Sequence, residues 1–378
     1  MLLSFCFKNY LSFKNLTTVH LSGAHSGSVY CLYGKPASGK TNWVRALLFM
    51  GNYYLHVSQN PLLAREILHP FWADEQAMFD QSLFEITFKA QNEVYRYGFT
   101  LTTQKVFSEW LYVSRYNDEE ALLFSRNDDQ ITWGIKQPDE TNLSQTLANS
   151  PTFLLLPLLQ KQPFLPALTM VKLFTSQLLV VLGNPDSDKT DYQTAKQLLL
   201  APAYKKWVLT LLQHIDPTIT DIVPATHAGA SAHAADAKHG YAEPVFNRNS
   251  MLTLLHQAND PTGFIAVQRR YKTPTGALLP LYFNAEFEEG STIKSVLNYG
   301  FLLAHIWRHG GAFVIDMPEK TWGRQLTLKI ARLFTRRKPH LPPASLVFTA
   351  SMPIKLPGTT LLAVVKNQHG VSGINQMP

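Results

Sequence analysis

Residues 29–41 read VYCLYGKPASGKT, and this stretch decides the fold. The apolar run from Val29 to Tyr33 predicts a buried strand, and the loop after it has the spacing G-x-x-x-x-G-K-T. Beyond the loop, Val44, Leu47 and Leu48 recur at helical spacing. A strand, a glycine loop and a helix in this order are the context that a phosphate-binding loop requires. The sequence therefore predicts a P-loop.

The residue types of the loop indicate how a nucleotide would be held. Gly34 and Gly39 let the backbone curl, so that amide N–H groups point inward at the positive end of the following helix. We expect Lys40 to reach the β- and γ-phosphates of ATP and the hydroxyl of Thr41 to bind Mg²⁺. The predicted nucleotide-binding residues of the loop are Gly34, Lys35, Pro36, Ala37, Ser38, Gly39, Lys40, Thr41 and Asn42.

A carboxylate for the metal is predicted far along the chain. Asp316 directly follows the apolar run AFVI at residues 312–315. P-loop proteins place a carboxylate that helps to hold Mg²⁺ at the end of such a strand. Thr41 and Asp316 are therefore the predicted magnesium residues. The alternative is an aspartate that only caps the end of a strand.

Composition limits the class of protein. Of the 378 residues, 46% are hydrophobic and 16% are charged, so the chain can bury a large core, and we expect one large domain with an elaborated insert. Cys6 and Cys31 lie in apolar runs and are expected to be reduced core thiols, which favours a reducing cytosol. The formal net charge of +7 is weak support for phosphate or nucleic-acid contacts.

No export or membrane insertion is expected from the sequence. The N-terminus lacks the basic and long apolar regions of a signal peptide. The most apolar stretch, residues 151–182, is interrupted by prolines and lysines, so it falls short of the roughly 20 apolar residues of a membrane helix. We expect this stretch to be a buried helical region of a soluble, cytoplasmic protein with no membrane partner.

The order of patterns along the chain predicts a nucleotide domain split by an insert. Aromatic and β-branched segments predict strands at residues 2–8 and 16–21 and an antiparallel sheet from 83 to 124, leucines at helical spacing follow from 140 to 220, and strand and helix patterns return in the last third. The predicted divisions are 1–139 for the N-terminal half of the ATPase domain, 140–260 for a helical insert with a mobile loop at 225–240, and 261–378 for the C-terminal half.

Seven motifs together resemble those of a known family. They are KNYLSFKN from Lys8, YGKPASGKTN from Tyr33, YRYGFTL from Tyr95, SEWLY from Ser108, EEGST from Glu288, VIDMPEK from Val314 and FTASMP from Phe348. In this order they resemble the AAA/ABC-type ATP-binding proteins related to the overcoming-lysogenization-defect and abortive-infection ATPases of bacterial phage defence. The resemblance covers nearly the whole chain.

The resemblance implies a fold and a partner. It implies an α/β P-loop NTPase of the ABC/SMC-like type, with a mixed central sheet, an antiparallel β subdomain and an inserted helical lobe. In the family, ATP and Mg²⁺ lie between two head-to-tail subunits, in a homodimer or a heterodimer, and a signature element reaches the γ-phosphate from the second subunit. The matching residues here are Gly290 and Ser291, with Glu288 where the family has serine. Alternatively, Ser291 is the phosphate-facing hydroxyl.

Four departures from the family concern the γ-phosphate or the attacking water. Besides Glu288, Met317 replaces the glutamate that polarises the water, Ser351 replaces the switch histidine, and Leu11 stands where relatives carry a basic residue. Glu319 is the candidate substitute base, although a two-residue shift moves a carboxylate several ångströms. The residues expected to hold ATP and Mg²⁺ are intact. We therefore expect the protein to bind ATP but to hydrolyse it slowly or not at all by itself.

Three functions are indicated by this pattern. The first is a slow ATPase subunit of a phage-defence system, whose nucleotide state controls dimerisation or a separately encoded effector. The second is a non-catalytic, nucleotide-bound scaffold. The third is DNA binding through the basic residues Arg324, Lys329, Arg332, Arg336, Arg337 and Lys338, for which a solvated helix face is the alternative. His227, His233 and His239 are expected to lie in a solvated loop, with metal binding as the alternative.

Overall fold

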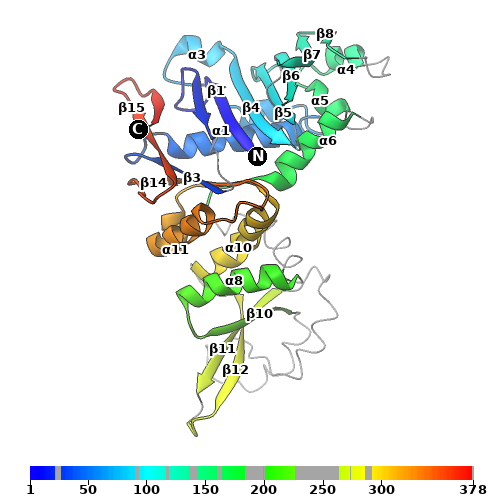
Figure 1. The fold of residues 1–378 in the computed structure, drawn as a ribbon. Helices are drawn as coiled ribbons and strands as arrows, with labels where there is room; N and C mark the ends of the chain where they lie inside the picture. The colour runs from blue at the N-terminus through cyan, green and yellow to red at the C-terminus, as the bar shows by residue number, and fades with distance from the viewer. Residues whose placement is uncertain are drawn as a thin grey trace, which may run out of the picture. The chain divides into compact units, whose positions relative to one another are not determined.

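The computed structural model describes residues 1–21, 27–90, 93–115, 119–135, 143–159, 164–183, 199, 201–225, 264–272, 274–285 and 292–376. The chain forms two compact units (Figure 1). The first unit consists of Met1–Leu182, His309–Met317 and Ala331–Pro378, and the second of Gly183–Arg308 and Pro318–Ile330.

A seven-stranded antiparallel sheet forms part of the first unit, in the order β2-β1-β4-β5-β6-β7-β8. Its strands are β1 (Leu2–Lys8), β2 (Thr17–His20), β4 (Ser82–Ala90), β5 (Glu93–Leu101), β6 (Val106–Arg115), β7 (Ala121–Asn127) and β8 (Gln130–Trp133). Burial alternates along β4, where Phe84, Ile86 and Phe88 are fully buried. This alternation is typical of a sheet with one face on the core. The predicted antiparallel sheet is confirmed.

A second sheet of the first unit carries the P-loop and has the order β16-β15-β3-β14-β13-β9. Its strands are β3 (Gly27–Tyr33), β9 (Leu178–Val181), β13 (Gly311–Ile315), β14 (Ala344–Ala350), β15 (Thr359–Lys366) and β16 (Ser372–Gln376). The strands β15, β3, β14, β13 and β9 pair in parallel, and β16 pairs antiparallel at one edge. The sheet is therefore mixed, as predicted.

One strand of this sheet corrects the sequence analysis. Residues 151–182 were expected to form a helical region, yet Leu178–Val181 is the strand β9, which pairs in parallel with β13 from Ala312 to Ile315. Two valines favour a strand, and the ladder with β13 outweighs the helical spacing of the leucines before it. The strand β9 is therefore the neighbour of β13, the strand that Asp316 directly follows.

Helix α1 (Lys40–His56) follows the P-loop and lies along one face of the antiparallel sheet (Figure 1). Its inward face is aromatic. The ring of Phe49 is 4.6 Å from that of Phe84 and stacks on Tyr53 at 5.5 Å, while Trp43 meets Phe5 edge-on at 6.1 Å. Packed aromatic rings of this kind fix the helix axis. The start of α1, where phosphate would bind, is held by this core.

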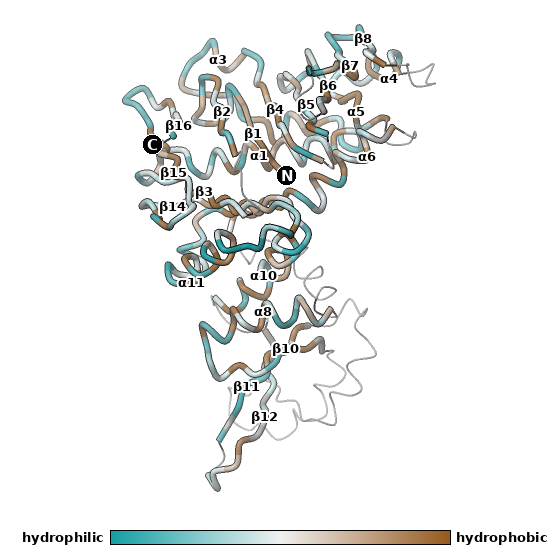
Figure 2. Tube along the Cα trace, viewed as in Figure 1, coloured by the Kyte–Doolittle hydropathy of each residue, from teal (hydrophilic) through white to brown (hydrophobic). Residues whose placement is uncertain are grey.

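The remaining helices of the first unit are short. They are α2 (Leu63–Ile67), α3 (Glu75–Phe79), α4 (Leu143–Asn149), α5 (Leu155–Leu158), α6 (Leu165–Lys172) and the π-helical turn η2 (Leu173–Gln177). The end of α11 (Pro318–Thr335) also belongs to this unit. Figure 2 shows hydrophilic and hydrophobic residues along both α1 and α11, as expected of helices with one buried face.

The second unit combines a small sheet with helices. The antiparallel sheet β10-β11-β12 consists of β10 (Ile219–Ala225), β11 (Phe264–Lys272) and β12 (Leu278–Asn284). The unit also contains helix α8 (Pro202–Ile215), helix α10 (Thr292–His309) as far as Arg308, and helix α11 as far as Ile330. The predicted mobile loop at 225–240, apart from Ala225, lies outside the described residues, and the divisions after residues 139 and 260 stay predictions.

Among the helices in the described part of the chain, none is long and apolar enough to cross a membrane.

Candidate nucleotide-binding site

The P-loop connects β3 to α1 through two left-handed residues. Ala37 has φ 61° and Gly39 has φ 109°, and α1 begins at Lys40. Glycine is needed at 39 both for this φ and for space, because a Cβ there would lie 2.4 Å from the hydroxyl of Ser372. A Cβ at Gly34 would lie 2.2 Å from the carbonyl oxygen of Val364. Close packing on β15 and β16 therefore explains both glycines of the motif.

The side chain of Lys40 is folded back onto the loop. Its ammonium donates to the carbonyl oxygens of Gly34 and Lys35, both at 2.8 Å, and lies 3.4 Å from the hydroxyl of Ser38. The residue is 6% exposed. The carbonyl oxygens hold the ammonium against the loop, where phosphate oxygens would replace them when a nucleotide binds.

The predicted magnesium residues lie together. The hydroxyl of Thr41 donates to Oδ2 of Asp316 at 2.8 Å, although 275 positions separate them in the chain. Oδ1 of Asp316 accepts from the hydroxyl of Thr349 at 2.5 Å, and the Asp316 amide donates to the carbonyl of Val181 at 3.0 Å. Asp316 is 7% exposed. Its carboxylate is thus held by a donor on each oxygen, one from the P-loop and one from β14.

Met317 follows Asp316 in a strained conformation. It has φ 46° and ψ 51°, a left-handed backbone that is uncommon for a residue other than glycine. Its amide donates to Thr349 Oγ1 at 2.8 Å, the same oxygen that donates to Asp316. Its thioether accepts no proton at neutral pH, so residue 317 supplies no general base.

Glu319 lies in the other compact unit, in the first turn of α11. Its Oε1 is buried and makes no hydrogen bond to the described residues. Gly323, with φ 73° and ψ 159°, interrupts the helix four residues later. The role of Glu319 as substitute base stays a prediction.

Several predicted residues cannot be placed in the site. Gly290, Ser291, Glu288 and Glu289 lie outside the described residues, as do His227, His233 and His239. In the parts of the chain that the structure describes, no three side chains of His, Cys, Asp or Glu are grouped so that they could hold a metal ion. Ser351 is exposed just beyond β14.

Three residues around the loop are not among those that the sequence predicts for the site. Thr349 donates to Asp316, while Ser12 and Ser372 form hydrogen bonds with Asn42 and with the Ser38 carbonyl. The side-chain amide of Asn42, predicted to contact nucleotide, donates to Ser12 Oγ at 2.8 Å. Separations of up to 360 residues leave no local signal, so only the fold identifies these contacts.

The loop fits a nucleotide phosphate with Mg²⁺ by its donor set. No side chain caps the N-terminus of α1 at Gly39, and the first amides of a helix lack acceptors within the helix. These amides, the Lys40 ammonium and the positive end of the helix favour an anion. The Thr41 hydroxyl and the Asp316 carboxylate are oxygen ligands of the kind that Mg²⁺ prefers.

The comparisons with known proteins agree with this geometry. Residues 29–172, which include the P-loop, α1 and the strands β4 to β8 of the antiparallel sheet, match the family described as "AAA domain, putative AbiEii toxin, Type IV TA system". Residues 29–172 are therefore similar to an AAA domain of the abortive-infection type. A search of curated proteins finds no match.

Among solved structures, this chain is similar to an Smc head bound to the C-winged helix domain of ScpA. The TM-score is 0.53 at 11% identity, over 100% of this chain and 98% of that chain. At this identity the likeness shows the fold alone, and it confirms the predicted ABC/SMC-like class. The SMC head domain from Thermotoga maritima matches with TM-score 0.42 at 12% identity, covering 100% and 99% of the two chains. RecF with ATP matches with TM-score 0.37 at 10% identity, covering 100% and 97%.

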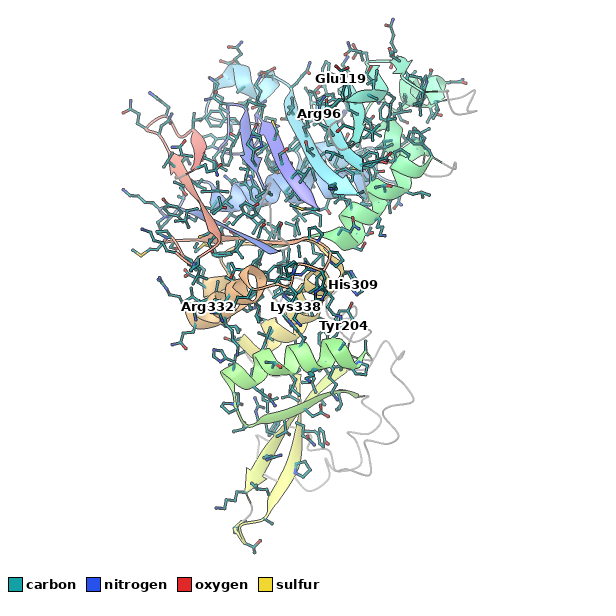
Figure 3. All side chains as sticks on the ribbon, in the orientation of Figure 1. Arg96, Glu119, Tyr204, His309, Arg332 and Lys338 are labelled. Carbon is teal, nitrogen blue, oxygen red and sulfur yellow. The ribbon has the colours of Figure 1, made fainter. Side chains whose placement is uncertain are left out.

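The basic cluster predicted for DNA is only partly exposed. Arg324, Arg332, Arg336 and Lys338 are exposed, and Figure 3 labels Arg332 and Lys338. Arg337 differs, since it is 5% exposed and burial lowers the pKa of its guanidinium. It therefore does not belong to a DNA-facing surface, and direct DNA binding loses one of its six residues.

Proposed function

We propose that this chain binds ATP with Mg²⁺ through residues 34–42 and Asp316 and hydrolyses it slowly on its own. Its nucleotide state would control dimerisation or a separately encoded effector in bacterial phage defence. The Thr41–Asp316 hydrogen bond at 2.8 Å carries the proposal, because it joins the P-loop to the carboxylate at the end of β13. The similarity of residues 29–172 to AbiEii-like AAA domains supports a role in phage defence.

Slow hydrolysis is proposed because the residue after Asp316 is a methionine. A water that attacks the γ-phosphate needs an acceptor for its proton, and such a base contributes about 10²- to 10⁴-fold. Met317 offers no such acceptor. Its left-handed backbone is held by the hydrogen bond from its amide to Thr349 Oγ1. The same observation favours the second candidate, a non-catalytic scaffold that holds ATP and pairs with a complete ATPase.

Binding is tested by titrating purified protein with a fluorescent ATP analogue, with Mg²⁺ and with a chelator. We expect Lys40→Ala to abolish saturable binding. Its ammonium is the side-chain cation that the loop carbonyls of Gly34 and Lys35 hold in place. Asp316→Asn should bind ATP with a reduced dependence on Mg²⁺. Lys105→Ala is the matched control, because Lys105 lies outside the loop and pairs with Asp128 at 2.8 Å. Equal binding by wild type and Lys40→Ala would contradict the proposal.

A further inference from the structure

Four polar residues from three distant segments meet behind the P-loop in the first unit. Asn42 Nδ2 donates to Ser12 Oγ at 2.8 Å, Ser12 Oγ is 2.8 Å from Ser372 Oγ, and the Ser372 hydroxyl donates to the carbonyl of Ser38 at 2.7 Å. Ser12 is 7% exposed and Ser372 is 3% exposed. Water therefore has little access to this chain of hydrogen bonds.

The donors in this chain run in one direction. Each serine hydroxyl has a single proton, so Ser372 cannot donate to Ser12 and to Ser38 at once. If Ser372 donates to the Ser38 carbonyl, Ser12 donates to Ser372 and accepts from Asn42, and every contact is satisfied. The reverse orientation would leave the Ser38 carbonyl without this donor, which is costly in a buried place. The order is thus Asn42 to Ser12 to Ser372 to Ser38.

The last bond of this chain orients a peptide group of the P-loop. The described chain contains no cis peptide bond, and in a trans peptide the N–H points opposite to the C=O. Because the Ser38 carbonyl accepts from the Ser372 hydroxyl of β16, the Gly39 N–H points away from that hydroxyl. Without this hydrogen bond, the backbone freedom of Gly39, which has φ 109°, would allow the peptide group more than one direction.

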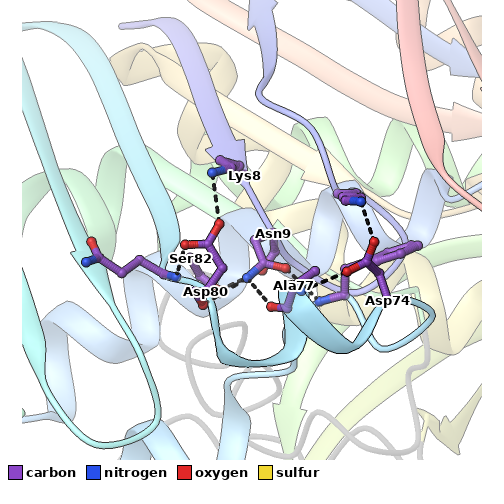
Figure 4. Close-up of polar contacts among 9 residues, drawn as sticks. Lys8, Asn9, Asp74, Ala77, Asp80 and Ser82 are labelled. Atoms are coloured by element: carbon purple, nitrogen blue, oxygen red, sulfur yellow. Dashed lines mark hydrogen bonds and ion pairs between the residues drawn. The ribbon is translucent and has the colours of Figure 1, made fainter.

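Both serines are held from outside the loop. The Ser372 amide donates to the Ser12 carbonyl at 2.7 Å, which ties β16 to the segment after β1. That segment is fixed by Asn9, whose side-chain amide donates to the carbonyls of Ala77 and Asp80 at 2.7 and 3.0 Å (Figure 4). The Ser82 hydroxyl donates to the Asn9 carbonyl at 2.6 Å. These contacts hold both serines in place before any ligand binds.

We propose that Ser372, supported by Ser12, is a positioning residue for the phosphate chain of the nucleotide. It acts by presetting the direction of the Gly39 amide. This inference rests on the proposed function, since it assumes that the P-loop binds ATP. It gives the C-terminal hairpin β15–β16 a part in nucleotide affinity.

The test measures the affinity of the full chain for ATP·Mg²⁺ and for inorganic tripolyphosphate, which has no base. Ser372→Ala should weaken both by the same factor, about tenfold, the effect of losing one buried hydrogen bond. Ser12→Ala should weaken both severalfold, and the double variant should bind about as Ser372→Ala does, because both serines act through one bond. A merely structural serine would instead lower the melting temperature of the nucleotide-free chain and leave the two affinities unchanged.

Ser345→Ala is the matched control. Ser345 lies on β14 of the same sheet, is 0% exposed, and its hydroxyl makes no hydrogen bond to the described residues. Its removal should leave both affinities within about twofold. If wild type binds ATP and Ser372→Ala and Ser12→Ala bind it equally well, the inference is overturned and the proposed function stands. If wild type binds no ATP, both are overturned. Should Ser372→Ala fail to fold, Ser12→Ala decides alone.

Discussion

At the scale of single residues, the proposed separation of ATP binding from hydrolysis rests on Met317. It follows Asp316 and has φ 46°. Its amide donates a hydrogen bond to the hydroxyl of Thr349, which in turn donates to Asp316. Met317 therefore lies beside Asp316, the carboxylate predicted to bind Mg²⁺, but its side chain lacks a proton acceptor.

Replacing Met317 by glutamate should restore a base. We expect Met317→Glu to raise steady-state ATP turnover at least about tenfold, since a positioned base contributes about 10²- to 10⁴-fold. The readout is phosphate release at saturating ATP·Mg²⁺. Met317→Gln is the matched control, because it has the same length and shape without the carboxylate. Equal turnover of the two variants would show that the missing base is not what limits hydrolysis.

The sequence pointed to Thr41 and Asp316, which the structure brings together, but not to the residues that support them. The spacing of the P-loop motif placed Lys40 and Thr41, and the apolar run before Asp316 placed the carboxylate that meets Thr41 at 2.8 Å. Thr349, Ser12 and Ser372 carry no local pattern, because isolated hydroxyls are ordinary in strands and turns. Their partners are up to 360 residues away.

At the scale of elements, Glu109 joins the antiparallel sheet to helix α5. It is 0% exposed on β6, and its carboxylate accepts from the amides of Leu155 and Leu156 and from the hydroxyl of Tyr97 at 2.9 Å. Arg126 lies nearby and is 2% exposed. Burial raises the pKa of Glu109, while Arg126 and the hydrogen bonds lower it, and burial dominates.

This raised pKa has a defined consequence for stability. A carboxyl group whose pKa is raised on folding contributes stability that is fully present below its unfolded pKa of about 4.3 and lost as the pH rises through the folded value. The free energy of unfolding of wild type relative to Glu109→Gln should therefore fall as pH rises from about 4 towards 8. Urea denaturation at a series of pH values measures it. A difference that stays flat or rises with pH would contradict the assignment.

Elements with strong local patterns were predictable, and β9 was not. The aromatic and β-branched segments in residues 83–124 predicted the antiparallel sheet. Leu178–Val181 is only four residues long and directly follows leucine-rich helical turns. Its pairing with β13 decides its conformation, and that pairing spans more than 130 residues of sequence.

At the scale of the whole molecule, nucleotide should govern assembly. The resemblance implies a head-to-tail dimer with ATP at its interface, so we expect the chain to sediment as a monomer without nucleotide and as a dimer with ATP·Mg²⁺. Slow hydrolysis should make the dimer persist. Lys40→Ala, which we expect to lack ATP binding, should remain monomeric. Analytical ultracentrifugation measures this, and a mass independent of nucleotide would contradict control of dimerisation.

The central claim is that ATP binding is intact and hydrolysis is weak, and it is tested most directly by measuring both on the same purified chain. We predict saturable, Mg²⁺-dependent ATP binding, with turnover far below the roughly 1–10³ s⁻¹ of ordinary enzymes. Glu319→Gln should abolish the residual turnover if Glu319 is the substitute base. Turnover at ordinary rates that is lost in Lys40→Ala and unchanged in Glu319→Gln would contradict both the weak site and the substitute base.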